Sequence, residues 1–257
     1  MQVRALARNP QTAALPPHVE IFRGDLTVPQ TLNAALDGID AVFLVWTAPP
    51  ATVAPALDRI LGRAPRVVFL SSPYKTAHPL FQGGHPNPIR DLHSEIERLV
   101  EASGRQWTFL RPGMFASNAL FWWAPQIRRG DLVRWPYLSA PTAPIDDRDI
   151  AAAAVRALCH DGHAGKEYVL TGPQSLTQFE QVSIIGAALG RSLRIEELSP
   201  EQALQELPFP PFITSMLLRA WADAVGQPAL VTSTFAEITG APPRSFHTWA
   251  ADHTSAF

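Results

Sequence analysis

The sequence has few cysteines and lysines and no long apolar run. Cys159 is its one cysteine, which excludes an intramolecular disulfide and is typical of a reducing compartment. Lys75 and Lys166 are the only lysines and the net charge is -2, so the clustered cations that neutralise nucleic-acid phosphates are missing. No segment approaches the ~20 apolar residues of a membrane span, and the first residues form no signal-like apolar stretch. We therefore expect a cytoplasmic protein that binds neither nucleic acid nor membranes.

The composition is that of a folded α/β protein. A hydrophobic fraction of 46% supports a large core, and the 25 prolines are interpreted as loop residues. Short apolar segments alternate with helical patterns, which is typical of a parallel sheet covered on both faces. Strands are expected at residues 3–7, 19–22, 41–45, 66–70 and 105–110. A helix is expected between residues 28 and 37, with Leu32, Ala35 and Leu36 on one face and Gly38 at its end.

Residues 88–118 combine a helix, a strand and a sharp turn. The helix is expected to bury Leu92, Ile96, Leu99 and Val100, because they follow the spacing of one helical face. Its other faces are expected to carry Glu95, Glu97, Arg98 and Glu101. After Gly104 the strand leads into Arg111, Pro112 and Gly113, where proline removes a hydrogen-bond donor and glycine permits a reversal. The carboxyl end of such a strand is where open α/β sheets bind ligands.

The second half of the sequence has a different pattern. Asp149 is expected to cap an alanine-rich helix over residues 150–158, and His160 and His163 are expected to face solvent because no third metal ligand is near. Thr177 and Glu180 have the spacing of a capping box that opens a helix to Leu189. A strand is expected at 193–198, helices between 200 and 225 with a break at 208–211, and a final helix that docks through Phe246 and Trp249.

Several of these segments resemble a known family. Glu97-Arg-Leu-Val-Glu-Ala-Ser-Gly, Trp107-Thr-Phe-Leu-Arg-Pro-Gly-Met-Phe and Asn118 are similar to the NmrA-like group of atypical short-chain dehydrogenases/reductases. The similarity continues at residues 3–10, 19–26, 41–45, 143–151 and 168–173, and so covers nearly the whole chain. It implies one domain over residues 1–257 with a Rossmann-like parallel sheet, helices on both faces and a small C-terminal α/β lobe. The core would cover roughly 1–150, and the substrate-binding lobe roughly 115–135 and 172–257.

One part of the family pattern is missing from the sequence. In dinucleotide-binding folds a glycine-rich turn after the first strand leads to a helix whose N-terminus holds the pyrophosphate. No such motif occurs here, and the family's opening strand, turn and helix would occupy roughly 30 residues before Met1. The fold is therefore expected to be N-terminally shortened, either because the sequence is truncated or because the turn was lost. Without two charge-assisted hydrogen bonds and the helix dipole, worth roughly 4–7 kcal/mol, dinucleotide binding should be weak.

The resemblance implies cofactor contacts after the first three strands. Arg8 would grip the 2′-phosphate of NADP, so NADPH is expected in preference to NADH, although Arg8 also fits a solvated surface position. Asp25 and Leu26 would contact the adenine, or Asp25 could only cap the following helix. Trp46 and Thr47 would flank the nicotinamide ribose, or Trp46 could close a hydrophobic lid.

The resemblance also implies a catalytic region, from which the usual tyrosine is absent. In the family motif Y-x-x-x-K, His93 takes the lysine position and Ile89 the tyrosine position. His93 could donate a proton near neutral pH, hydrogen-bond the ribose, or only pack. Ser72 is expected to orient the substrate and Ser71 to contact the cofactor, although a serine pair is also ordinary turn chemistry.

Further contacts are implied around the next strand end. Backbone groups of Pro112, Gly113, Met114 and Phe115 would face the nicotinamide end of the cofactor. The expected substrate contacts are Tyr74, Asn118, Trp122 and Trp123. The tryptophans could instead pack into a core, because large aromatic side chains rarely all face water.

The function implied by the resemblance is an NAD(P)H-dependent oxidoreductase for a small carbonyl, quinone or unsaturated compound. A homodimer is compatible with these features. A second hypothesis is a non-catalytic NAD(P) sensor that regulates a protein partner. A third is an isomerase or cyclase that needs no cofactor, if the phosphate-binding turn is absent.

Overall fold

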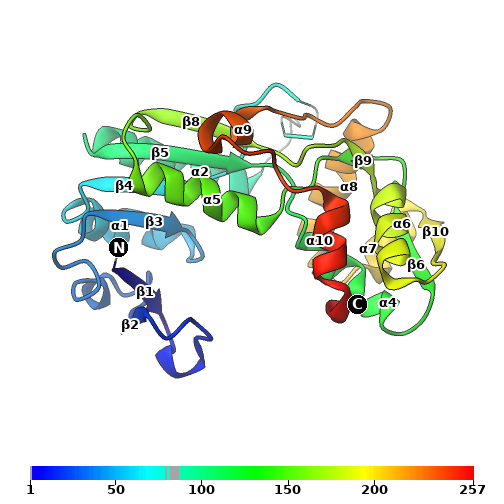
Figure 1. Ribbon diagram of the computed structural model, residues 1–257, viewed down its shortest axis with the longest axis horizontal. Coiled ribbons are helices and arrows are strands. Elements are labelled where there is room, and N and C mark those ends of the chain that lie inside the picture. Colours follow the sequence, from blue (N-terminus) through cyan, green and yellow to red (C-terminus); the bar gives the residue numbers. More distant parts are fainter. Residues whose placement is uncertain (1, 79, 82–86) are drawn as a thin grey trace. The chain divides into compact units, whose positions relative to one another are not determined.

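A computed structural model describes residues 2–78, 80–81 and 87–257 (Figure 1). The chain forms two compact units. Unit 1 contains Met1–Ser71, Pro88–Phe109 and Ala157–Glu167. Unit 2 contains Ser72–Asn87, Leu110–Arg156 and Tyr168–Phe257. In the parts of the chain that the structure describes, no helix has the length and apolar character needed to cross a membrane.

Parallel strands form the framework of unit 1. The strands are β1 (Val3–Ala7), β2 (Val19–Arg23), β3 (Ala41–Val45), β4 (Arg66–Leu70), β5 (Gln106–Pro112) and β8 (Lys166–Leu170), the last two of which run on into unit 2. β3 pairs in parallel with β4, from Ala41 opposite Arg66 to Val45 opposite Leu70. The larger sheet has the order β3-β4-β5-β8, which confirms the expected α/β architecture.

β1 and β2 form a separate parallel pair, with Val3 opposite Val19 and Ala7 opposite Arg23. Among the described strands, none pairs with both β1 and β3. A Rossmann sheet has the order 3-2-1-4-5-6, in which one further strand would separate a pair like β1-β2 from a strand like β3. The expected N-terminal shortening of the fold stays a prediction.

Helices and an apolar core complete unit 1. The helical segments are η1 (Pro10–Thr12), η2 (Pro29–Leu32), η3 (Pro50–Thr52), α1 (Val53–Leu61) and α2 (Pro88–Ala102). Val67 and Phe69 of β4 pack with Ile96 and Val100 of α2, and all four are fully buried. The expected helix at residues 28–37 is wrong, because only the short 3-10 helix η2 forms there. The Thr31 hydroxyl donates to the Val28 carbonyl at 2.7 Å, a local bond that competes with helix formation.

Unit 2 is built from short strands and helices, one of which, α5, ends in unit 1. Its segments are α3 (Asn118–Trp122), α4 (Ala124–Ile127), β6 (Leu132–Pro136), β7 (Pro141–Thr142), α5 (Asp147–Cys159), β9 (Leu176–Thr177), α6 (Gln178–Leu189), β10 (Arg194–Leu198), α7 (Pro200–Glu206), α8 (Pro211–Ala224), α9 (Thr234–Thr239), α10 (Phe246–Asp252) and η4 (Thr254–Ala256). β6 pairs in parallel with β10, and β7 in antiparallel with β9. The expected strand at 193–198 and the break between α7 and α8 are confirmed.

Capping residues were predicted with mixed success. Thr177 and Glu180 form the capping box of α6, as expected. The expected cap at Asp149 is wrong, because α5 begins two residues earlier, at Asp147. Asp146 instead accepts a hydrogen bond from the Arg148 backbone N–H at 2.9 Å. This bond satisfies a donor of the first turn, as a side chain before the helix normally does.

A close approach of two backbones requires glycine at position 172. The Gly172 N–H donates to the Ala143 carbonyl at 3.1 Å. A Cβ atom at Gly172 would collide with the carbonyl group of Pro144. Because that obstacle is backbone, it cannot move aside as a flexible side chain could.

We predict that Gly172→Ala lowers the free energy of unfolding by roughly 1–3 kcal/mol through this overlap. Gly130→Ala is the matched control, because a Cβ there meets open space, and it should change stability by less than about 0.5 kcal/mol. Urea denaturation of both variants makes the comparison. Equal stability of the two variants would contradict the proposed close approach.

Candidate functional site

In unit 1, the residues expected at the site follow the carboxyl ends of four strands. Arg8 follows β1, Asp25 follows β2, Trp46 follows β3 and Ser71 follows β4. Because β1 is parallel to β2, Arg8 and Asp25 follow the carboxyl edge of that pair, and because β3 is parallel to β4, Trp46 and Ser71 follow the carboxyl edge of theirs. The carboxyl edge is the usual ligand-binding edge of an α/β sheet.

The Asp25 carboxyl group, which follows β2, has a lowered pKa. The main causes of that lowered pKa are hydrogen bonds from the backbone N–H and the hydroxyl of Thr27, both at 2.8 Å from Oδ1. Asp25 therefore forms a local turn, close to the structural alternative expected for it. Leu26 packs partly buried against the core, whereas Arg8 is exposed.

Trp46 and Thr47 follow β3 but differ in environment. Trp46 is only 8% exposed, packs into the core of unit 1 and donates its indole N–H to the Ala48 carbonyl at 2.7 Å. Its indole ring therefore contacts the core, and the expected contact with the nicotinamide ribose stays a prediction. Thr47 is exposed at the strand end, so it is the member of the pair that is accessible to a ligand.

A buried carboxylate joins β4 to α2. Glu97 is 1% exposed and accepts a hydrogen bond from the Ser71 hydroxyl at 2.6 Å. The expectation that Glu97 lies on a polar face of the helix is therefore wrong. A buried carboxylate is tolerated when hydrogen bonds compensate its lost hydration.

His93 lies one helical turn before Glu97 on α2. Its ring meets Phe69 edge to face, with 5.7 Å between the ring centroids. Burial lowers the pKa of His93, and the neighbouring Glu97 charge partly opposes that effect. Ser71, Glu97 and His93 thus place a hydroxyl, a carboxylate and a mainly neutral imidazole on β4 and α2.

In unit 2, the turn after β5 is fixed by backbone hydrogen bonds. The Gly113 N–H donates to the Leu170 carbonyl at 2.9 Å, and the Ile145 N–H donates to the Met114 carbonyl at 2.9 Å. Phe115 forms a parallel bridge with Ile145. Pro112 is the last residue of β5. The turn is therefore fixed by hydrogen bonds to Leu170, at the end of β8, and to Ile145, just before α5.

Tyr74 lies beside this strand in unit 2. The guanidinium carbon of Arg111 is 5.4 Å from the Tyr74 ring centroid, and the Lys75 ammonium nitrogen is 5.6 Å from it. Arg111 is 2% exposed. Two cations against one phenol ring form cation–π contacts. Ser72 is half-buried, two residues before Tyr74.

The three remaining expected substrate residues are at α3 of unit 2. Asn118 begins α3 and is half-buried. Trp122 is 9% exposed and Trp123 is fully buried in the core of this unit. Trp135 stacks on Trp122, with 5.6 Å between the ring centroids. The tryptophan positions match the alternative in which they pack into a core, so Asn118 is the most accessible of the three.

A polar pocket of about 250 Å³ lies at the amino ends of β4 and β5 in unit 1. Arg66, His160 and His163 are among its lining residues. Arg66 already donates to the Leu158 carbonyl and the Asp161 carboxylate, both at 2.9 Å. No metal-binding group of three His, Cys, Asp or Glu side chains occurs among the described residues.

The sequence analysis did not identify two residues of the candidate site, Glu97 and Arg111. Glu97 could have been found, because it is four residues after His93 and so on the same helical face. Arg111 was assigned to a turn, but it is a buried strand residue. Its contact with Tyr74 depends on tertiary structure and has no local signal.

Comparison with known proteins places this geometry in a family. A family model described as NAD(P)H-binding matches residues 1–161. A (4-alkanoyl-5-oxo-2,5-dihydrofuran-3-yl)methyl phosphate reductase of Streptomyces griseus is 37% identical over 99% of this chain and 90% of that protein. An NAD(P)H azoreductase of Xenophilus azovorans is 35% identical over 98% of this chain and 85% of that protein.

Solved structures show the same fold. NADPH-dependent quinone oxidoreductase QOR2 of Escherichia coli aligns with a TM-score of 0.78 and 22% identity, over 98% of this chain and 90% of that chain. NmrA, a negative transcriptional regulator, aligns with a TM-score of 0.72 and 16% identity, over 99% of this chain and 87% of that chain. The chain belongs to the NAD(P)H-binding family.

We predict that His93 makes stability depend on pH. Because its folded-state pKa is lowered, the unfolded chain binds a proton more readily. The stabilising contribution is complete above the ordinary histidine pKa of about 6.5 and is lost as pH falls through the lower folded-state pKa. Denaturation of His93→Gln should therefore show a smaller loss of stability on acidification than denaturation of the unaltered protein.

The control is His18→Gln, at an exposed position. It should keep the pH dependence of the unaltered protein. An unchanged slope in His93→Gln would show that His93 is not held in its neutral form.

Proposed function

We propose that the protein is an NADPH-dependent reductase of small quinones, azo compounds or other unsaturated compounds. The observation that carries the proposal is the position of Arg8, Asp25, Thr47 and Ser71 directly after parallel strands in a chain of the NAD(P)H-binding family. Two relatives above 30% identity are named as reductases, and one of them as an NAD(P)H azoreductase. The bound nicotinamide would supply the hydride.

The preference for NADPH is assigned to Arg8. A guanidinium after the β1 strand can form two parallel hydrogen bonds with a 2′-phosphate, which NADH lacks. Arg8 is exposed, so it can reach a ligand without breaking a core contact. Asp25 and Leu26 would hold the adenine, and Thr47 would lie near the nicotinamide ribose.

His93 is proposed to hold the cofactor ribose by a hydrogen bond. Its lowered pKa leaves the imidazole mainly neutral at pH 7, which weakens the case for His93 as a proton donor. Glu97 would keep the Ser71 hydroxyl in place through their 2.6 Å hydrogen bond. Ser72 would orient the substrate.

The substrate is assigned to unit 2. Gly113, Met114 and Phe115 would face the nicotinamide, while Tyr74 and Asn118 would contact the substrate. The lobe formed by residues 115–135 and 172–257 would supply the remaining apolar surface. Trp122, at 9% exposure, is the tryptophan that could reach that surface.

A non-catalytic NADPH sensor is the second candidate. It is favoured by Ile89, an aliphatic residue at the position where the family motif has its tyrosine acid. The fold likeness to the regulator NmrA is compatible with this candidate. Binding without turnover would distinguish the sensor from the reductase.

We predict that NADPH raises the thermal unfolding temperature more than NADH does. Ligand at ~100 times its dissociation constant adds about 2.7 kcal/mol of stability. The titration should extend to millimolar nucleotide. Arg8→Gln should weaken NADPH binding about tenfold and leave NADH binding unchanged.

Arg63→Gln removes the same charge from an exposed position after α1 and serves as the control. It should bind both nucleotides as the unaltered protein does. If neither nucleotide stabilised the protein, the proposal would be rejected. If Arg8→Gln weakened the binding of NADPH and of NADH equally, the role of Arg8 would be rejected.

We predict that NADPH is oxidised in the presence of quinones or azo dyes, as followed by absorbance of the reduced nicotinamide. Ser71→Ala should reduce turnover roughly 10- to 100-fold if the hydroxyl helps to position the reacting groups. Ser103→Ala, in the loop after α2, is the control and should retain turnover. Nucleotide binding without oxidation across the panel would favour the sensor.

A further inference from the structure

A segment of unit 2 lies between the turn after β5 and the end of β8. The Ile145 N–H donates to the Met114 carbonyl at 2.9 Å, and the Ala116 N–H donates to the Ile145 carbonyl at 2.8 Å. On the other side, the Ala143 carbonyl accepts from Gly172 at 3.1 Å. Residues 143–145 therefore hold the backbone of Met114–Ala116 directly.

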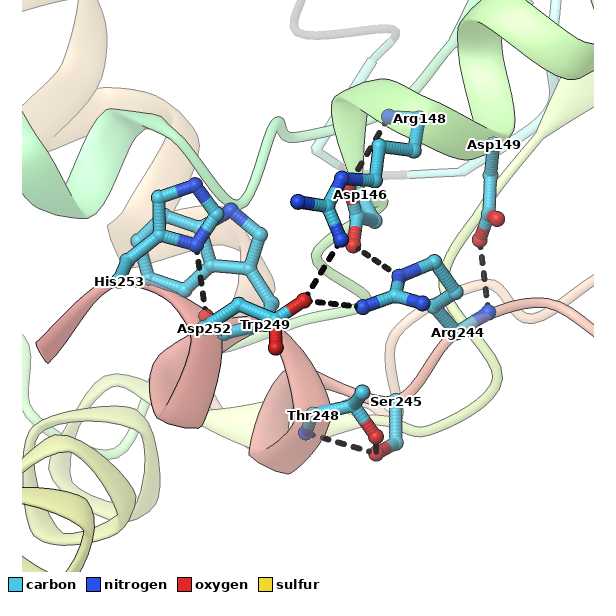
Figure 2. Close-up of polar contacts among 9 residues, drawn as sticks. All are labelled: Asp146, Arg148, Asp149, Arg244, Ser245, Thr248, Trp249, Asp252 and His253. Carbon is cyan, nitrogen blue, oxygen red and sulfur yellow. Dashed lines mark hydrogen bonds and ion pairs between the residues drawn. The ribbon is translucent and has the colours of Figure 1, made fainter.

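The next residue, Asp146, is anchored by Arg244 (Figure 2). The Arg244 Nε donates to Asp146 Oδ2 at 2.7 Å, and the Arg244 backbone N–H donates to Asp149 Oδ2 at 2.7 Å. A second guanidinium nitrogen contacts Asp252 of α10 at 2.5 Å. Arg244 thus connects the start of α5 with the segment before α10.

Two carboxylates near the start of α5 are buried, that of Asp146 just before the helix and that of Asp149 in its first turn. Asp146 is 2% exposed and Asp149 is 4% exposed. Burial raises the pKa of Asp149, while the hydrogen bond from the Arg244 backbone acts in the opposite direction. Buried charge is costly unless it is paired, so Arg244 fixes where Asp146 can lie.

α10 also packs through apolar side chains into the core of unit 2. Phe246 and Trp249 are buried and stacked, with 5.3 Å between their ring centroids. The His253 ring also stacks on Trp249 at 4.5 Å. Burial of Phe246 and Trp249 in this core therefore stabilises α10 in addition to the polar contacts of Arg244.

We propose that Arg244 is a positioning residue which, through Asp146 and Ile145, fixes the Met114–Ala116 backbone for the nicotinamide end of the cofactor. The inference rests on the proposed function for the identity of that ligand. The holding of the turn by Arg244 can be tested without any ligand.

The test compares Arg244→Gln with Arg148→Gln in the full chain. Arg148 also pairs with Asp252, at 2.7 Å, and its loss removes the same charge from the same network. The Asp146 carboxylate accepts from the backbone N–H of Arg148, which a change of its side chain leaves in place. Arg148→Gln is therefore the matched control.

The first readout is hydrogen exchange at the Ile145 and Ala116 amides. Arg244→Gln should speed exchange there about tenfold or more, whereas Arg148→Gln should change it less than twofold. The His253 amide, bonded to the Ala250 carbonyl at 3.2 Å, reports on α10 and should be unaffected in both variants. Arg244→Lys, which keeps the charge, should restore part of the protection and also serves if Arg244→Gln does not fold.

The second readout is the dissociation constant for NADPH, which should rise about tenfold in Arg244→Gln and stay within twofold in Arg148→Gln. Equally faster exchange at His253 would show a general structural role and overturn the proposal. Faster exchange at Ile145 and Ala116 with unchanged NADPH binding would also overturn it. If the unaltered protein does not bind NADPH, the proposed function fails, whereas the exchange data still decide whether Arg244 holds the turn.

Discussion

Parallel strand pairing is the constraint on which the candidate site depends. In a parallel sheet every strand ends at the same edge, so residues far apart in sequence can serve one ligand. β1-β2 and β3-β4 both obey this rule in unit 1. Arg8, Asp25, Thr47 and Ser71 owe their positions to it rather than to any local motif.

Each unit contains a buried carboxylate that fixes its hydrogen-bond partners. In unit 1 the Glu97 carboxylate accepts from Ser71 and lies close to His93, so it fixes a hydroxyl at the end of β4. In unit 2 Asp146 is held by Arg244 and lies next to the residue that bonds to Met114. A buried carboxylate without a partner costs free energy, so the folded state favours the arrangement in which each carboxylate keeps its hydrogen bond.

The sequence predicted β1 to β5 and β10, most clearly β3, whose five residues are all apolar. It also predicted the family, whose motif over residues 97–118 combines a helix, strand and turn. The helix at residues 28–37 was wrong because Thr31 bonds to the local backbone, a competition that periodicity does not record. Glu97 was predicted to be exposed because it is charged, although it lies on the same helical face as His93. The link between Arg244 and Asp146 joins residues 98 positions apart and has no sequence signal.

The account is tested most directly by hydrogen exchange of the protein with and without saturating NADPH. Protection should increase after the strands, at residues 8, 25–26, 47 and 71, and at the turn of residues 113–116. The amino ends of β4 and β5, which lie at the opposite edge of the sheet, should remain unchanged. Protection confined to that opposite edge, or none at any strand end, would contradict the assignment of this edge to the nucleotide.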